Sequence, residues 1–99
     1  MKKLGANYKV EYHEFVVKYD IPKLDKAVRS RIKAVIEIKI MTAPEIFGAP
    51  LRGTLKGYWK LRVGDWRIVY LISSKVVKII LIAHRREVYN SAERRIGKS

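Results

Sequence analysis

The feature that most constrains the fold is a pair of strand-like runs with almost nothing between them. Tyr58 to Val63 alternates apolar and polar residues, which predicts a half-buried strand. Only Gly64-Asp65 separates it from the run Trp66 to Ile72, and so short a loop is typical of a tight hairpin. After a turn at Ser73-Ser74, Val76 to Ala83 is almost continuously apolar and β-branched, which indicates a central strand covered on both faces.

The alternation also divides the side chains of the first strand between two faces. Trp59 and Leu61 fall on the face that we expect to be buried, and Lys60 and Arg62 fall on the outward face. Trp66, on the next strand, is interpreted with Trp59 as a core anchor rather than a platform for stacking bases.

The first half of the chain predicts helical support for this sheet. Tyr8 to Phe15 alternates with period two, so it is predicted to be another half-buried strand. Asp20-Ile21-Pro22 offers a capping carboxylate followed by a proline, so we expect an amphipathic helix to begin there and to run to about Met41.

Two shorter helices complete the prediction. Thr42 and Glu45 have the spacing of a capping box, so a short helix should follow and end at Gly48. Apolar residues at four-residue spacing predict a final helix over Glu87 to Ile96. We therefore predict one α+β domain over residues 1–99: a twisted antiparallel sheet of about four strands, with N-terminal helices packed on one face and a short C-terminal helix.

Sequence composition narrows the class of protein. No apolar run approaches the roughly 18 residues that a membrane span requires, and the N-terminus lacks the apolar segment of a signal peptide. Without cysteine there is no disulfide or thiol chemistry, which is compatible with a reducing compartment. We therefore expect a cytoplasmic protein that makes no membrane contact.

Positive charge is the strongest compositional signal. The formal net charge is +13, which implies an anionic partner, and nucleic acid is favoured over a membrane surface or an acidic protein. The charge is uneven: residues 1–51 hold ten Lys/Arg against six Asp/Glu, whereas residues 52–99 hold twelve against three. The predicted hairpin and the strand after it therefore carry most of the excess.

Familiar catalytic motifs are absent from the sequence. It has no glycine-rich phosphate loop, zinc-ligand spacing or serine-nucleophile elbow, so we expect neither a metal nor another cofactor. What remains is cations, imidazole and tyrosine. The candidate catalytic residues are Lys60, Arg62, Arg67, His84, Arg85 and Tyr89, and the candidate RNA-binding residues are Arg52, Lys56 and Arg86.

These residue types suit the cleavage of RNA through its own 2′-hydroxyl. That reaction needs a base for the hydroxyl proton, cations around the phosphorane and an acid for the leaving 5′-oxygen. Arginine suits the cationic role because its planar fork meets phosphate oxygens and stays charged. Lys60 or His84 could act on protons, and Tyr89 could relay a proton or stack on a base. The same residues fit a non-catalytic RNA-binding surface equally well.

Three segments resemble the RelE toxin branch of the RelE/ParE superfamily. They are Leu51-Arg52-Gly53, the run Gly57 to Tyr70, and His84-Arg85-Arg86-Glu87-Val88-Tyr89. The resemblance covers most of the chain. It implies a microbial-ribonuclease-like fold and a toxin that inhibits translation as a metal-independent, ribosome-dependent mRNA endoribonuclease (an mRNA interferase) cutting in the A site.

The resemblance also implies individual roles. Lys60 matches a lysine of the family's catalytic strand, Arg67 an arginine that grips the scissile phosphate, and Tyr89 a tyrosine that stacks or helps proton transfer. Arg85 lies where another phosphate-binding arginine occurs. Arg62 replaces a second lysine of the best-known pattern, and because arginine is a very poor base, Lys60 or His84 becomes the candidate base.

The resemblance further implies partners: the ribosome, mRNA and a RelB-like antitoxin that neutralises the toxin in a hetero-oligomer. Two other functions stay open, a ParE-like inhibitor of DNA gyrase and a non-catalytic RNA- or ribosome-binding protein. Bland alternatives also stay open for single residues. Arg67 could pair with an acid across the sheet, Tyr89 could be a core contact under the last helix, and Arg86 could be solvated or face the antitoxin.

Overall fold

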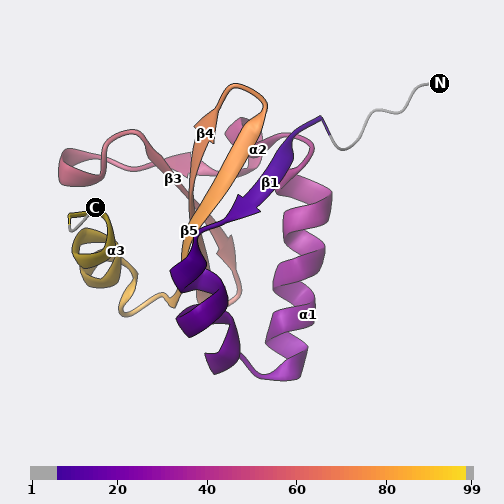
Figure 1. Cartoon of the computed structure of the whole chain (residues 1–99), viewed down its shortest axis with the longest axis vertical. Helices are drawn as coiled ribbons and strands as arrows, with labels where there is room; N and C mark the ends of the chain where they lie inside the picture. Colours follow the sequence, from indigo (N-terminus) through magenta and orange to yellow (C-terminus); the bar gives the residue numbers. More distant parts are fainter. Residues whose placement is uncertain (1–6, 98–99) are drawn as a thin grey trace.

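The computed structural model describes residues 7–97, which form a five-stranded sheet between two helical layers (Figure 1). The strand order is β1-β5-β4-β3-β2. The strands are β1 (Lys9–Tyr12), β2 (Ala49–Pro50), β3 (Tyr58–Val63), β4 (Trp66–Ser73) and β5 (Val76–His84).

The sheet differs in two ways from the predicted antiparallel sheet of about four strands. It is mixed, because β1 pairs with β5 in parallel, whereas the pairs β2–β3, β3–β4 and β4–β5 are antiparallel. It also gains β2, a strand too short to show periodicity in the sequence. The α+β class and the β3–β4 hairpin are confirmed, with Gly64 at φ 61° in the turn.

The N-terminal helical layer is more broken than the predicted single helix. It consists of a π-helical segment (Val16–Asp20), a 3₁₀ turn (Ile21–Lys23), α1 (Lys26–Val35) and a second π-helical segment (Ile36–Ile40). A short helix, α2 (Pro44–Phe47), follows and ends at Gly48 as predicted.

Both predicted capping arrangements are wrong. The cap of α1 is Asp25, whose Oδ1 accepts a hydrogen bond from Val28 N at 2.9 Å, and the side chain of Asp20 makes no cap bond. Thr42 does not cap α2, because its hydroxyl donates backwards to Ile38 O at 2.7 Å. Asp20 is instead buried and bonds to distant residues, which removes it from local capping.

Two hydrophobic cores lie on opposite faces of the sheet, under α1 on one side and α3 (Val88–Gly97) on the other (Figure 1). The larger core joins the N-terminal helices to one face of β3, β4 and β5, and Trp59 and Trp66 pack against it as predicted. The smaller core joins α3 and the segment before β3 to the other face. Strand β5 is thus covered on both faces, as its apolar sequence predicted.

A single-residue bulge changes the direction of side chains along β5. Val69 of β4 pairs with Leu81, but the next residue, Tyr70, pairs with Ile79, so Ile80 is an extra residue in the ladder. An extra residue reverses the alternation of faces beyond it. Ile82 therefore lies in the larger core together with Ile79.

Tyr70 fastens α2 to the sheet. Its side chain is fully buried, and its hydroxyl donates to Pro44 O at 2.7 Å. A Cβ at Gly48 would lie 1.9 Å from the Tyr70 hydroxyl oxygen, so position 48 requires glycine for space. This contact holds the chain that continues into β2.

In the described part of the chain, the structure has no helix with the length and apolar character needed to span a membrane.

Candidate active site

Lys60, Arg62 and Arg67 lie on the α3 side of the sheet. Lys60 pairs with Val69, and Arg67 pairs with both Arg62 and Ala83. Directly paired residues in a sheet point to the same face, and Val69 and Ala83 belong to the smaller core under α3. The hairpin register and α3 therefore bring three predicted site residues to one surface.

Lys60 meets Tyr89 across this surface. Lys60 Nζ donates to the Tyr89 hydroxyl at 2.5 Å and lies 4.9 Å from the centre of the ring. Tyr89 is 50% exposed, so it is not a core contact under the last helix. The two side chains line a groove of about 340 Å³ between α3 and the segment that connects α2 to β3. The groove therefore places an amine and a phenol side by side, open to a ligand.

Arg62 and Arg67 lie directly opposite each other on β3 and β4. Arg67 Nη1 donates to Gly64 O at 2.9 Å and to Trp66 O at 3.0 Å, which ties its guanidinium to the hairpin turn. In residues 7–97 no carboxylate forms an ion pair with Arg67, so pairing with an acid across the sheet is not its role there. Like charges placed opposite each other repel, and an anion between them would relieve the repulsion.

Arg85 reaches the same hairpin turn from the end of β5. Its backbone N–H donates to Asp65 O at 2.8 Å, and its Nε lies 3.8 Å from Asp65 Oδ1 in an exposed ion pair. From the opposite layer, Arg31 of α1 approaches so closely that a Cβ at Gly64 would lie 3.0 Å from its Nη2. The sequence did not predict a role for Arg31, because the residue pattern of a helix does not show which distant turn its side chains will contact.

His84 is not brought to this surface. The bulge at Ile80 places it on the larger-core face, where it pairs with Trp66 and packs edge-on against that ring at 5.5 Å between centroids. Its Nδ1 accepts a hydrogen bond from Arg86 N at 3.3 Å. Of the candidate proton-transfer residues, the structure thus groups Lys60 and Tyr89 and separates His84.

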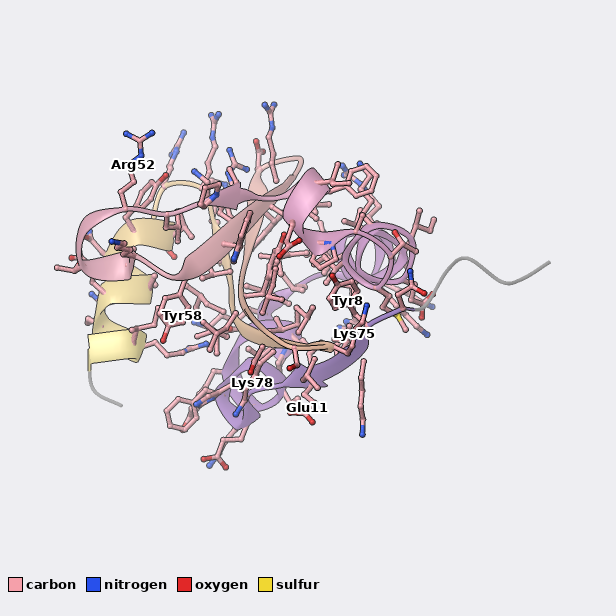
Figure 2. The ribbon with its side chains drawn as sticks, turned by 90° about the horizontal axis from the view of Figure 1, so that it is seen from above. Tyr8, Glu11, Arg52, Tyr58, Lys75 and Lys78 are labelled. Atoms are coloured by element: carbon pink, nitrogen blue, oxygen red, sulfur yellow. The ribbon has the colours of Figure 1, made fainter. Side chains whose placement is uncertain are left out.

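The candidate RNA-binding residues are exposed at separate places. Arg52 lines the groove beside Lys60 and projects outward (Figure 2). Lys56 follows the 3₁₀ turn Gly53–Leu55, and Arg86 follows β5.

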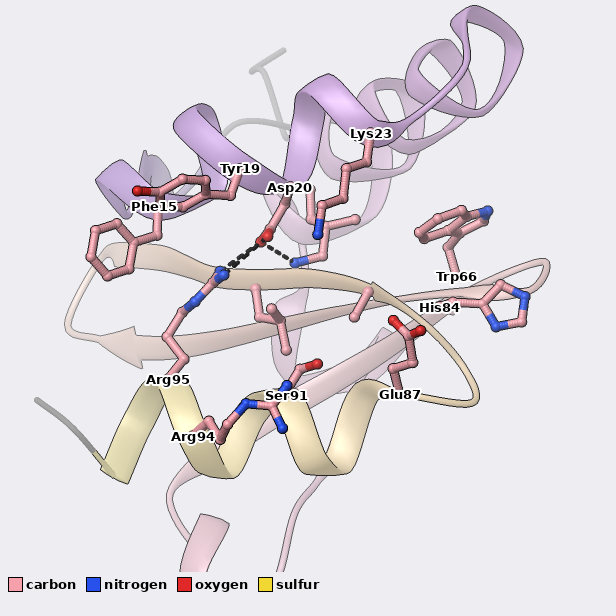
Figure 3. A pocket seen from close by; sticks show the side chains of 13 residues that line it. Phe15, Tyr19, Asp20, Lys23, Trp66, His84, Glu87, Ser91, Arg94 and Arg95 are labelled. Carbon is pink, nitrogen blue, oxygen red and sulfur yellow. Dashed lines mark hydrogen bonds and ion pairs between the residues drawn. The ribbon is translucent and has the colours of Figure 1, made fainter.

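His84 lines a second cavity, of about 460 Å³, on the open edge of β5 (Figure 3). Beyond Tyr12, where β1 ends, this edge meets side chains instead of a strand: Ile82 N donates to Asp20 Oδ2 at 2.9 Å, and Ile80 O accepts from Arg95 Nη1 at 3.0 Å. Asp20 and Arg95 also form a two-bond ion pair, at 2.6 and 3.1 Å. The sequence analysis missed this pair.

The family is decided by the agreement of a sequence model and solved structures. The model of the ParE toxin of type II toxin-antitoxin systems (parDE) matches residues 10–89. The isolated RelE toxin of Escherichia coli is 31% identical, with 90% of this chain and 98% of that chain covered and a TM-score of 0.59. The chain belongs to the RelE/ParE superfamily of type II toxins.

Other solved structures agree with a RelE-like member of this superfamily. The RelBE2 toxin-antitoxin complex of Mycobacterium tuberculosis is similar to this toxin at 26% identity and a TM-score of 0.75, covering 80% of this chain and 99% of that one. The RelB-RelE complex of Methanococcus jannaschii, at 20% identity and a TM-score of 0.64 over 82% and 96% of the two chains, shows the same fold. No curated protein sequence gives a match.

The geometry of this RelE-like toxin is consistent with chemistry by cations and a phenol. Among residues 7–97, no group of three His, Cys, Asp or Glu side chains is arranged to hold a metal ion. The groove supplies an amine–phenol pair, and the adjoining hairpin supplies arginines.

Proposed function

We propose that this toxin is a metal-independent endoribonuclease that cleaves mRNA in the ribosomal A site through the 2′-hydroxyl. The observation that carries the proposal is the contact between Lys60 and Tyr89 on the same sheet face as the facing Arg62 and Arg67. An arrangement of proton-transfer groups beside phosphate-binding groups is what cleavage by the 2′-hydroxyl requires.

In the proposed reaction the 2′-oxygen attacks the adjacent phosphorus and the bond to the 5′-oxygen breaks. The products are a 2′,3′-cyclic phosphate and a free 5′-hydroxyl. Lys60 and Tyr89 handle the two proton transfers, and the guanidinium groups of Arg62, Arg67 and Arg85 stabilise the charge of the phosphorane. Arg62 cannot serve as the base, because a guanidinium does not lose its proton in proteins.

The proposed dependence on the ribosome follows from the openness of the site. Tyr89 is half exposed and Arg62 and Arg85 are exposed, so the chain alone offers little to hold an RNA strand in line for attack. Positioning of the mRNA by the ribosome can raise the cleavage rate by several orders of magnitude. Free RNA is accordingly proposed to be a poor substrate.

The proposed inhibitor is a RelB-like antitoxin, which forms a hetero-oligomer with the toxin in the cytoplasm. This proposal is supported by solved structures of similar toxins bound to RelB antitoxins, including the RelBE2 complex of Mycobacterium tuberculosis. The toxin has a formal charge of +13, so we expect an acidic segment of such a partner to bind it and to cover Arg62, Arg67 and Arg85.

The deciding experiment adds purified toxin to ribosomes programmed with a defined mRNA and maps the cut ends. Cleavage within the A-site codon, with a 2′,3′-cyclic phosphate on the upstream product, is the expected result. An intact mRNA under conditions in which the toxin remains folded overturns the proposal.

A second function is favoured by the family model, which describes ParE toxins. This alternative is inhibition of DNA gyrase by binding, which uses no RNA chemistry. A supercoiling assay separates the two: inhibition of gyrase without mRNA cleavage selects the alternative. Ribosome binding that weakens steeply with salt, with neither activity, selects a non-catalytic RNA-binding protein.

A further inference from the structure

The groove that holds Lys60 and Tyr89 also contains one acidic side chain. Glu93 lies one helical turn after Tyr89 on α3, and both residues line the groove with Lys60 and Arg52. The carboxylate forms no ion pair within residues 7–97. Its negative charge is therefore not cancelled by the neighbouring cations through direct contact.

One hydrogen bond orients this carboxylate. Thr54, in the short turn before β3, donates its hydroxyl proton to Glu93 Oε2 at 3.0 Å. A carboxylate offers about four acceptor positions, so both oxygens can still accept from a ligand. The segment that faces α3 across the groove contributes Arg52 and an apolar surface made by Ala49, Pro50, Leu51 and Leu55.

The Glu93 carboxylate and its surroundings disfavour a phosphate group and favour a nucleobase. A carboxylate repels a phosphate, so this part of the groove does not suit the RNA backbone. A half-exposed tyrosine ring, an apolar wall and an oriented acceptor are instead what a nucleobase needs, because unstacked bases are bound by aromatic rings and by hydrogen bonds to their edges. A volume of about 340 Å³ lies within the range of small-ligand sites.

We propose that Glu93 is a specificity-determining residue that accepts hydrogen bonds from a guanine base next to the scissile phosphate. Guanine presents a ring N–H and an amino group side by side on its Watson–Crick edge, which matches the two oxygens of one carboxylate. Uracil presents a single N–H between two carbonyl oxygens, which the carboxylate repels. The inference rests on the RNA cleavage proposed above.

The test replaces the carboxylate by an amide in Glu93→Gln and maps cuts on programmed ribosomes. The mRNAs carry each of the four bases on either side of the cut. The wild-type toxin should cut faster with guanine at one of these positions, and Glu93→Gln should reduce that preference roughly tenfold, because one good bidentate contact contributes discrimination of this order. Thr54→Val should reduce it less, because it removes only the group that orients the carboxylate.

Glu87→Gln is the matched control. It makes the same change of charge immediately before α3, but Glu87 lines the cavity on the other side of the helix. Its cleavage pattern should equal that of the wild type. If Glu93→Gln cuts with the wild-type base distribution at any rate, the inference is wrong and the proposed function stands.

If the wild-type toxin leaves mRNA intact, the proposed function fails and a binding measurement decides the inference. NMR titrations of the toxin with GMP and UMP follow the backbone signals of Tyr89 and Glu93. Tighter binding of GMP that disappears in Glu93→Gln supports a guanine site. Equal binding of the two nucleotides, or no binding of either, overturns it.

Discussion

Asp20 and Arg95 lie 75 positions apart in the chain, yet buried Asp20 and partly buried Arg95 form a two-bond ion pair that joins the N-terminal helices to α3. The same two side chains complete the backbone bonding of β5 at Ile80 and Ile82, where no neighbouring strand continues. One pair of side chains therefore closes the edge of the sheet and fixes the helix that carries Tyr89 and Glu93.

Arg95→Met should strongly destabilise the fold. It leaves the Asp20 carboxylate buried without its cation, and the loss of one partner of a buried pair costs about 3–5 kcal/mol. Urea unfolding followed by circular dichroism measures the change. The neighbouring Arg94→Met is the control, because Arg94 is exposed, and it should change the free energy of unfolding by less than about 0.5 kcal/mol. Equal effects of the two substitutions would contradict the role of the pair.

Arg67→Ala should lower the rate of A-site cleavage by on the order of a hundredfold or more, because it removes a cation from the developing phosphorane. The pairing of β3 with β4 is made by backbone groups, so the loss of cleavage activity should appear without unfolding. Lys78→Ala removes a positive charge from the same sheet face farther from the hairpin turn and should cut at nearly the wild-type rate. A comparable loss in both variants would point to general charge rather than a phosphate contact.

Two substitutions of Tyr89 separate its two proposed roles. Tyr89→Phe keeps a ring above Lys60 but removes the hydroxyl that accepts the Lys60 hydrogen bond, whereas Tyr89→Ala removes both. If the hydroxyl transfers a proton, both variants should lose roughly 10²-fold or more in single-turnover cleavage rate. If the ring only stacks on a base, Tyr89→Phe should retain nearly full activity.

Tyr70 should give the fold a measurable weakness in alkali. Burial raises the pKa of Tyr70 from 10.0 to about 12. The folded protein thus holds this proton more tightly than the unfolded chain. The resulting stability is complete below pH 10 and is lost as the pH rises from there through 12. Tyr70→Phe should lower stability by about 0.5–1.5 kcal/mol at neutral pH, since Pro44 O loses one of its two donors and keeps the bond from Gly48 N, and it should flatten the alkaline decline. Urea midpoints between pH 8 and 11 provide the comparison.

Gly48→Ala should be destabilising because the new Cβ would overlap the Tyr70 hydroxyl. Overpacking of this kind typically costs about 1–3 kcal/mol. In the Tyr70→Phe background the nearest overlapping atom is absent, so the same substitution should cost less. A double-mutant cycle measured by urea unfolding tests the coupling. Strictly additive effects would show that the close approach of these two positions does not limit the choice of residue at 48.

Much of the architecture was readable from the sequence because its signals are local. Alternation gave the β3–β4 hairpin and the face that carries Lys60 and Arg62, and the continuous apolar run gave a strand buried on both sides. The helix caps were misassigned because a carboxylate before a helix can serve a local or a distant partner. Asp20 bonds across the fold and leaves the capping of α1 to Asp25.

The sequence by itself determined the α+β class, the hairpin, the concentration of positive charge after residue 51 and the residues that resemble RelE toxins. The tertiary structure decided which of those residues meet. A one-residue bulge at Ile80 turned His84 away from Lys60, and the docking of α3 brought Tyr89 and Glu93 to the groove. Such outcomes depend on register and on packing between distant segments, and a single inserted residue in a strand reverses the face of every residue beyond it.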